Sequence, residues 1–285
     1  MSKPPRLSLP PYATARTLAT ARGEFAVHDA VPTGAVRGTA LLVPGFTGSK
    51  EDFIGLLEPL AVAGYRVVAV DGRGQYESDG PADEAAYAQH ELALDVLAQA
   101  AALGTPVHLV GHSLGGLICR AAALRDPAAL RSLTLMSSGP AAITEAQQER
   151  TKLLVAGLEL MGDDMEAIWR AMRAQDPEDA REDSPELEEF LHRRWLANRP
   201  QQLIATGRQL ISEPDRIAEL AAGTPGLPKL VLSGAVDYAW PVPLMDEMAE
   251  RLGARRVVVP GTEHSPNAED PLTTAAALAA FWERH

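Results

Sequence analysis

The chain contains 285 residues, of which 46% are hydrophobic and 22% are charged, and its formal net charge is -12. The length predicts one large domain with an insertion, because it is long for one simple domain and short for three. The apolar fraction is sufficient for a sizeable core. The acidic balance argues against binding to nucleic acid and to anionic membrane surfaces. A single cysteine, Cys119, excludes an intramolecular disulfide. The N-terminus has no apolar run of signal-peptide length and no stretch approaches about 18 consecutive apolar residues, so a cytoplasmic location is expected.

Predicted strands and helices alternate along the first part of the chain. Residues 1–22 are rich in Pro, Arg and Thr without clear periodicity, and they are expected to form an extended lead-in. Short apolar runs predict strands, and longer segments with apolar residues at helical spacing predict helices. The strands are expected at 24–31, 39–43 and 65–70, and the helices at 52–63 and 82–102.

A strand turns into a helix within a few residues near the middle of the chain. Residues 107–110 form an apolar run typical of a buried strand, and an alanine-rich helical stretch follows at 117–124. The residues between them fit the pattern G-x-S-x-G, with Ser113 at the centre. Such a sharp turn holds its apex residue in an unusual backbone conformation. The positions two before and two after the apex must therefore be small, and Gly111 and Gly115 meet that condition.

This strand–turn–helix segment resembles the nucleophile elbow of the α/β-hydrolase superfamily. The resemblance implies an α/β fold in which a mostly parallel central sheet is flanked by helices, with Ser113 as a nucleophile above the sheet edge. It also implies that the backbone N–H of Leu114 is available to a developing oxyanion. The alternative is a Gly-rich turn whose serine only caps a helix.

The loop that follows the strand at 39–43 resembles a second element of the superfamily. In that family a loop at this place supplies one backbone N–H to the oxyanion hole, often from a His-Gly-x-x-Gly stretch. Here Pro44 stands in place of the histidine, while Gly45 and Gly48 keep the spacing. The resemblance implies that the N–H of Phe46 is the donor, a role that does not depend on the replaced side chain.

The loop after the strand at 65–70 resembles the Asp-x-Arg-Gly-x-Gly-x-Ser loop of the same superfamily. It begins at Asp71 and carries Tyr76 where the pattern has its later glycine. Asp71 and Arg73 are expected to brace this loop rather than to take part in catalysis.

The alternation continues through a strand at 132–136 and then stops at about residue 141. Between 141 and 223 no convincing strand is found, and apolar residues recur at helical spacing. This pattern predicts a helical cap at 141–223, inserted into a catalytic domain that is formed by 1–140 and 224–285.

Large apolar side chains of the predicted cap have two interpretations. They pack inside the cap, or they form an adaptable apolar roof over a substrate pocket. The candidates for lining the pocket are Met161, Met165, Trp169, Trp195 and, on a later loop, Trp240.

The α/β pattern resumes after the cap, and its loops carry candidate partners for the serine. Strands are predicted at 229–233 and 256–259, with a helix at 243–252 between them and a last helix from about residue 272. A serine hydroxyl is a weak nucleophile at neutral pH, so it needs a base within hydrogen-bond reach and a group that orients the base.

Of the seven histidines, only His264 follows a strand end on a loop. Asp237 lies on the loop after the preceding strand, whereas the loop after 132–136 carries no carboxylate. The spacing around both residues resembles the loops of the superfamily. The chain order of Ser113, Asp237 and His264 also matches its order.

The leading interpretation is a serine hydrolase that cleaves an ester, thioester or related acyl bond of a small molecule through an acyl-enzyme, with no cofactor and no metal. The alternatives within the same fold are an acyltransferase, a cofactor-free peroxidase-like enzyme, a C–C-bond hydrolase or a lyase. A ligand-binding receptor is a third class. Ser113 argues against haloalkane dehalogenases and epoxide hydrolases of this fold, which place aspartate at the apex.

Overall fold

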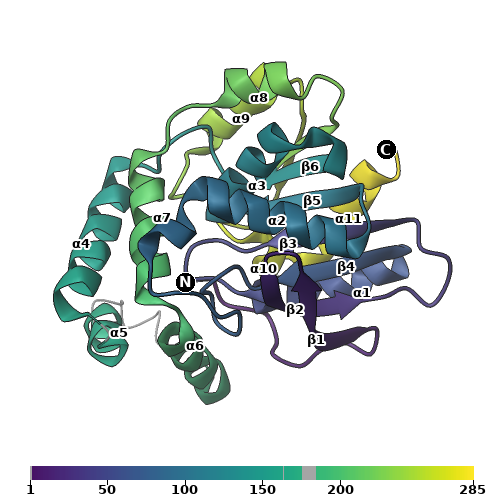
Figure 1. Ribbon diagram of the computed structural model, residues 1–285. Helices are drawn as coiled ribbons and strands as arrows, with labels where there is room; N and C mark the ends of the chain where they lie inside the picture. Colours follow the sequence, from purple (N-terminus) through teal and green to yellow (C-terminus); the bar gives the residue numbers. More distant parts are fainter. Residues whose placement is uncertain (1, 163, 175–183) are drawn as a thin grey trace.

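The computed structural model describes residues 2–162, 164–174 and 184–285. Within these residues an eight-stranded sheet forms the centre of the molecule, in the order β1-β2-β4-β3-β5-β6-β7-β8 (Figure 1). β2 pairs antiparallel with β1 and with β4, and the remaining pairings in the sheet are parallel. The strands are β1 (Ala13–Thr20), β2 (Gly23–Ala30), β3 (Gly38–Val43), β4 (Tyr65–Val70), β5 (Val107–His112), β6 (Leu130–Met136), β7 (Lys229–Gly234) and β8 (Arg255–Val259). This sheet and its flanking helices confirm the predicted α/β fold.

Helices cover both faces of the sheet and extend beyond one end of it. Their bounds are α1 (Ile54–Val62), α2 (Gln89–Leu103), α3 (Leu114–Arg125), α4 (Glu145–Met161), α5 (Met165–Ala174), α6 (Pro185–Ala197), α7 (Pro200–Ser212), α8 (Ile217–Gly223), α9 (Val242–Leu252), α10 (Pro266–Glu269) and α11 (Pro271–Trp282). None of the helices in the described ranges is long and apolar enough to cross a bilayer.

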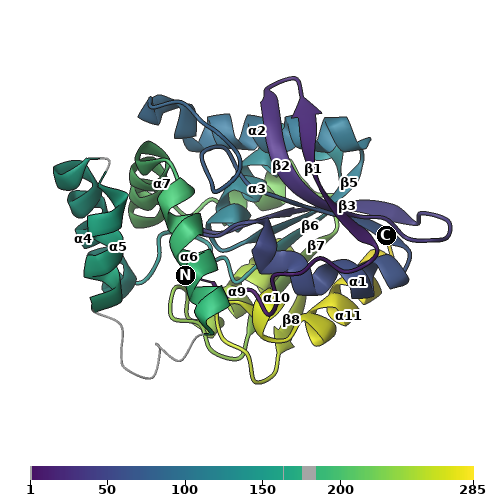
Figure 2. The same cartoon turned by 90° about the horizontal axis from the view of Figure 1, so that it is seen from below.

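The sheet separates two apolar layers. Adjacent residues of a strand point to opposite faces, so Leu41 and Val43 of β3 pack with α2 and α3, whereas Ala40 and Leu42 pack with α1 and α11. Figure 2 shows α2 and α3 on one side of the sheet and α1 and α11 on the other. Strands that are buried on both faces consist of nearly continuous apolar runs, and this explains why the central strands were readable from the sequence.

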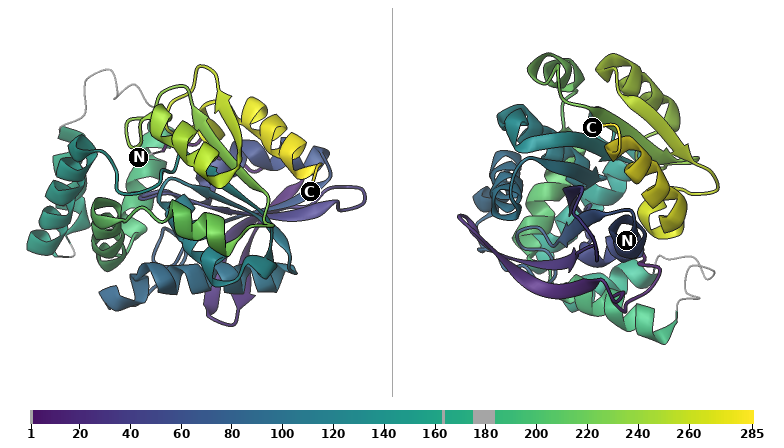
Figure 3. Two further views of the ribbon diagram at one scale, coloured as in Figure 1. Left: turned by 90° about the horizontal axis from the view of Figure 1, so that it is seen from above. Right: turned by 90° about the vertical axis from the view of Figure 1, so that its right-hand side faces the viewer.

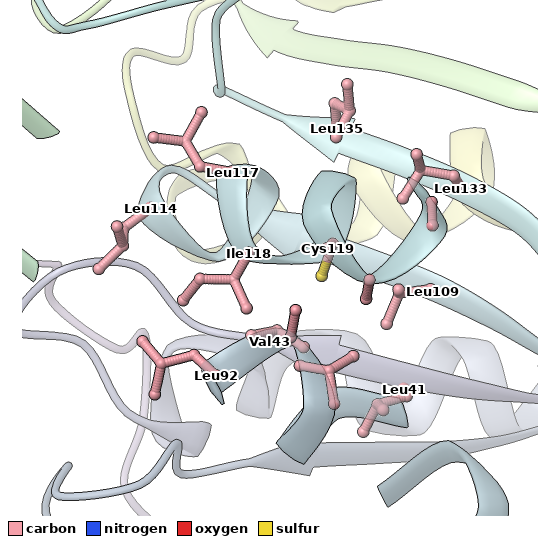
Figure 4. Packing of buried hydrophobic residues seen from close by; sticks show 14 of the residues in the cluster. Leu41, Val43, Leu92, Leu109, Leu114, Leu117, Ile118, Cys119, Leu133 and Leu135 are labelled. Atoms are coloured by element: carbon pink, nitrogen blue, oxygen red, sulfur yellow. The ribbon is translucent and has the colours of Figure 1, made fainter. Parts of the chain in front are cut away.

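Helix α3 lies against the centre of the sheet and holds the end of β5 in place. Figure 4 shows Leu117, Ile118 and Cys119 of α3 in the layer that contains Val43 and Leu109 of the neighbouring strands. Cys119 is fully buried there, and burial raises the pKa of its thiol well above the ordinary value. The cysteine therefore packs as a small apolar residue.

Ala13–Thr20, within the expected extended lead-in, form the strand β1, which the sequence did not predict. This strand is the antiparallel partner of β2 across a tight turn, with Thr20 opposite Gly23. Only Leu18 of β1 is buried, at 4% exposure, so the sequence shows little apolar alternation. Pairing with β2, rather than an apolar pattern of its own, determines the strand.

Two predicted helices begin differently in the structure. The first opens with a 3-10 turn at Lys50–Phe53, which Ser49 and Asp52 cap reciprocally, before α1 starts. The second is interrupted, because a 3-10 turn at Glu84–Tyr87 precedes α2 and the extended backbone of Ala88 separates them.

The described part of the segment between β6 and β7 is helical. α4 packs against α5 and α7, and α5 packs against α6. These helices lie at one end of the molecule, and the C-terminus lies at the other (Figures 1 and 3). α8 instead packs against α3 and α9 beside the sheet. The division into a catalytic domain and an inserted cap stays a prediction, and α4 to α7 are the helices that form a layer of their own.

Candidate active site

Ser113 occupies the single position between the end of β5 and the start of α3. Its backbone has φ 54° and ψ -121°, a positive φ that non-glycine residues rarely adopt. The neighbouring glycines are required by close contacts. A Cβ atom on Gly111 would collide with the carbonyl of Gly115, and one on Gly115 would collide with the carbonyl of Val43. The turn therefore presents the serine at the carboxyl end of the central strand.

A chain of hydrogen bonds joins Ser113 to two residues that are more than 100 positions away in the sequence. The Nε2 atom of His264 lies 3.1 Å from Oγ of Ser113, and its Nδ1 atom lies 2.9 Å from Oδ2 of Asp237. With its proton on Nδ1, the imidazole donates to the carboxylate and accepts from the hydroxyl. The other carboxylate oxygen of Asp237 accepts the N–H groups of Ala239 and Trp240 at 2.8 and 3.0 Å. The structure thus brings together the three residues that the sequence singled out.

The loop of His264 is held by two residues that the sequence analysis did not select. Nε2 of His112 donates to the carbonyl oxygen of His264 at 2.8 Å. The carboxylate of Glu269 accepts the N–H groups of Glu263 and Ser265, which flank the histidine. Burial lowers the pKa of His112 to about 3, so this side chain is neutral near pH 7 and acts through its single N–H. No local pattern marks these two residues, because their partners lie on the loop of another strand or across a helical turn.

Aromatic rings enclose the imidazole of His264. The ring centroids of Tyr238, His112 and Trp240 lie 4.8, 5.1 and 6.4 Å from its centroid. Trp240 is buried and covers the imidazole from the protein interior, whereas Tyr238 is half exposed. This packing restricts the rotation of the ring.

The loop after β3 passes directly beside the serine. A Cβ atom on Gly45 would lie 3.0 Å from Cβ of Ser113, so a larger residue here would press on the serine. Phe46 follows, and its N–H donates to no group in the described part of the chain. Leu114 is the first residue of α3, where a backbone N–H has no intrahelical acceptor. Both predicted oxyanion donors therefore lie next to Ser113 with an N–H that helical hydrogen bonds do not use.

The first connection of the helical segment is hydrogen-bonded to the loop that carries Asp237. Thr144 donates its N–H to the carbonyl of Ala239 at 2.9 Å and its hydroxyl to the carbonyl of Tyr238 at 3.0 Å. Nε1 of Trp240 donates to the carbonyl of Ala141 at 2.8 Å. The position of this connection and the position of the aspartate loop are therefore linked.

The residues proposed to line a pocket are placed mainly by packing. Met165, Trp169 and Trp195 lie in the apolar core between α4, α5, α6 and α7, and Nε1 of Trp195 donates to the carbonyl of Met165 at 2.8 Å. Met161 ends α4 and is 40% exposed. Phe46 is half-buried and contacts both this core and the core of the sheet. A role of the five candidates in lining a pocket stays a prediction.

Asp71 and Arg73 form ion pairs away from Ser113. Asp71 is fully buried and accepts from both the backbone N–H and Nζ of Lys50, at 2.7 and 2.8 Å. Burial raises the pKa of Asp71 despite the lysine beside it. Arg73 pairs with Asp95 of α2. Across residues 2–162, 164–174 and 184–285, no group of three or more His, Cys, Asp or Glu side chains is arranged to hold a metal ion.

Comparison with known proteins places the chain in a family. Residues 40–271 match the family described as the alpha/beta hydrolase fold. The chain is 34% identical over 225 residues to a pimeloyl-[acyl-carrier protein] methyl ester esterase of Aeromonas hydrophila subsp. hydrophila. The aligned region covers 75% of this chain and 83% of that relative. It is 33% identical over 150 residues to lipase 1 of Psychrobacter immobilis, which covers 49% of this chain and 46% of the lipase.

Solved structures agree with the fold. A thermophilic esterase from Thermogutta terrifontis superposes with a TM-score of 0.74 at 24% identity, covering 95% of this chain and 99% of the esterase. The resemblance that the sequence showed at the elbow is confirmed over most of the chain. The chain belongs to the α/β-hydrolase fold family, and it is a hydrolase of that family.

Proposed function

We propose that this hydrolase cleaves an ester, thioester or related acyl bond of a small molecule through a covalent intermediate on Ser113. The observation that carries the proposal is the hydrogen-bonded series Asp237–His264–Ser113, with the serine at a strained turn and next to two N–H groups. A nucleophile, a base and a group that orients the base are the requirements for acyl transfer by serine.

Each residue then has a defined task. His264 removes the proton from Ser113 as the hydroxyl attacks the acyl carbon, and Asp237 holds the ring and stabilises its positive charge. The N–H groups of Phe46 and Leu114 hold the oxyanion of the tetrahedral intermediate. His264 then protonates the leaving group, and a water molecule that the same histidine activates releases the acid from the acyl-enzyme.

The substrate class is supported by the relatives and by the nucleophile. One relative is named as a methyl ester esterase and another as a lipase, and both names describe enzymes that hydrolyse esters. We further propose that α4 to α7, within the predicted cap at 141–223, cover the substrate, because the connection that leads into α4 is hydrogen-bonded to the loop of Asp237. A cytoplasmic location remains part of the proposal.

The test is turnover of p-nitrophenyl esters of increasing acyl length, combined with labelling by a fluorophosphonate probe. We expect ester hydrolysis with a preferred acyl length, and a covalent label on the peptide that contains Ser113. The Ser113→Ala variant should lose both while keeping the melting temperature of the wild type. Product analysis with an added acceptor alcohol separates hydrolysis from acyl transfer.

Ser138→Ala is the matched control, because Ser138 is a buried serine in the loop that follows the neighbouring strand β6. This variant should keep both the label and the turnover. A Ser113→Ala protein that retains more than a few per cent of the esterase rate would overturn the proposed nucleophile.

A further inference from the structure

The side-chain amide of Gln75 lies on the carbonyl side of the peptide group that joins Gly45 to Phe46. Nε2 of Gln75 donates to the carbonyl oxygen of Gly45 at 2.9 Å, and the N–H of Gly48 donates to the same oxygen at 3.1 Å. Gln75 is 5% exposed, so water does not compete freely for these contacts. The carbonyl of Gly45 and the N–H of Phe46 belong to one planar peptide unit.

In a trans peptide the C=O and the N–H point in opposite directions within one plane. Two donors on the oxygen of Gly45 therefore fix the plane of this peptide and, with it, the direction of the N–H of Phe46. Donation to the carbonyl also polarises the peptide and strengthens its N–H as a donor.

We infer that Gln75 is a positioning residue for the oxyanion hole, acting on the reaction through the peptide of Phe46 rather than by touching the substrate. The inference rests on the function proposed above, in which the N–H of Phe46 holds the oxyanion. It assigns a role to a residue of the loop after β4, for which bracing by Asp71 and Arg73 was the only expectation.

The amide of Gln75 is itself oriented at both ends. Its Oε1 accepts the N–H of Gly72 at 3.1 Å, and this contact leaves Nε2 as the end that faces Gly45. The backbone N–H of Gln75 donates to the carbonyl of Gly72 at 2.9 Å. The side chain therefore has one orientation, and its donor cannot turn away without breaking the contact with Gly72.

The two loops are held together independently of Gln75. The backbone N–H of Lys50 donates to Asp71 at 2.7 Å, and its ammonium group donates to the same carboxylate. On the other side, Arg199 at the start of α7 donates its N–H to the carbonyl of Gly74 at 2.9 Å. Replacement of Gln75 should therefore remove the donor to the carbonyl of Gly45 without separating the loops.

The first variant is Gln75→Met, which keeps the length of the side chain and removes the donor. We expect kcat to fall about tenfold with KM within about twofold, because deletion of a whole oxyanion donor costs about 10²–10³ in kcat and this variant only misorients one. A trifluoromethyl ketone analogue of the preferred ester forms an oxyanion on Ser113. Its affinity should fall by the same factor as kcat/KM.

A second variant displaces the amide without deleting it. A Cβ atom on Gly72 would lie 2.5 Å from Oε1 of Gln75, so Gly72→Ala pushes that side chain from its place. We expect the same pattern of lower kcat, unchanged KM and weaker binding of the ketone. If Gln75→Met does not fold, Gly72→Ala decides the question by itself.

The matched control is Gln99→Met. Gln99 of α2 is buried, as Gln75 is, and both side chains line the same small pocket of about 20 Å³. In the described part of the chain its side chain makes no hydrogen bond to the loop of Gly45. This variant should keep the kcat and the ketone affinity of the wild type.

The outcomes are distinct. A wild-type rate that depends on Ser113, together with unchanged kcat and ketone affinity in Gln75→Met or Gly72→Ala, would overturn the role of Gln75 alone. Equal losses in Gln75→Met and Gln99→Met would also overturn it, since they would show only the loss of a buried amide. A wild-type protein without Ser113-dependent turnover would overturn the proposed function and, with it, this role.

Discussion

The conformation of Ser113 depends on residues that have no side chain. Gly111 and Gly115 allow β5, α3 and the end of β3 to meet around one serine, because any Cβ atom at either position would strike a backbone carbonyl. The energy that holds Ser113 at positive φ comes from this surrounding backbone, which leaves the serine no other conformation.

The first prediction concerns Gly115→Ala. The added methyl group would lie against the carbonyls of Val43 and Pro44, which are backbone atoms and cannot rotate away. We expect a loss of about 1–3 kcal/mol in the free energy of unfolding, as for other overpacked sites. Esterase activity should also fall, because the displaced strand end leads into the loop of Phe46. Urea unfolding and turnover of the preferred ester measure the two effects.

Gly157→Ala is the control for this experiment. Gly157 lies in α4, and a Cβ atom there would meet nothing within 4 Å. The substitution should raise the free energy of unfolding by up to about 1 kcal/mol, since alanine favours a helix more than glycine does. A Gly115→Ala protein with wild-type stability and turnover would contradict the steric account of the elbow.

At the scale of elements, one buried ion pair joins α6 to the loop that precedes α1. Arg194 of α6 is fully buried, and its guanidinium donates to Asp52 at 2.7 Å, to Oγ of Ser49 at 3.3 Å and to the carbonyl of Ser2 at 2.7 Å. Ser49 and Asp52 are the reciprocal cap of the turn that follows the Phe46 loop. The helix and the loop are thus held in a fixed relation.

The second prediction is that Arg194→Met destabilises the protein strongly. Removal of one partner leaves the carboxylate of Asp52 buried without its cation, which typically costs about 3–5 kcal/mol. Burial already raises the pKa of Asp52, so the variant should regain stability when Asp52→Asn is added and the charge disappears. Denaturant unfolding of the single and double variants measures the difference.

Arg208→Met is the matched control at this scale. Arg208 joins α7 to Glu84 in the 3-10 turn before α2, but both side chains are exposed, so the loss should stay below about 1 kcal/mol. Equal costs at Arg194 and Arg208 would show that burial does not determine the strength of the link.

At the scale of the whole molecule, three buried histidines make stability depend on pH. Burial lowers the pKa of His28 to about 4, and those of His108 and His112 to about 3. As the pH falls below about 6.5, the unfolded chain binds a proton on each histidine that the folded chain does not bind. The free energy of unfolding therefore decreases toward acid pH.

The third prediction is the size of this decrease. Well below pH 6.5 each histidine should contribute a slope of about 1.4 kcal/mol per pH unit, until the pH reaches its folded-state pKa. Asp71 acts in the opposite direction, because its raised pKa lets the folded chain hold a proton that the unfolded chain releases. Urea unfolding at several pH values between about 7.5 and 5 measures the net slope, because this range spans the pH at which histidines of the unfolded chain take up protons.

His108→Phe isolates one contribution. Phenylalanine keeps the stacking on Trp282 but cannot take up a proton in the unfolded state. The slope below about pH 6 should become smaller by about 1.4 kcal/mol per pH unit. The control is His90→Gln at an exposed position on α2. An unchanged slope in His108→Phe would show that His108 is protonated in the folded protein.

Much of the architecture followed from local sequence because the signals themselves are local. Buried parallel strands are short apolar runs, and the glycine spacing around Ser113 is a steric requirement within five residues. Asp237 and His264 could be selected because each lies on a loop after a predicted strand, and the carboxyl ends of parallel strands meet at the same edge of the sheet. Their hydrogen bonds to each other and to Ser113 required the order of the strands, in which β8 lies beside β7 and β7 beside β6.

The sequence could not predict contacts between residues that carry no local sequence signal. β1 has one buried side chain and exists through its pairing with β2. Gln75 and Arg194 are a common loop residue and a common helix residue until folding buries them beside Gly45 and Asp52. Local chemistry determined the turn that presents the serine. Only the packing of distant segments, which excludes water and fixes each donor against one acceptor, decided which side chains hold that turn and its neighbouring loops in place.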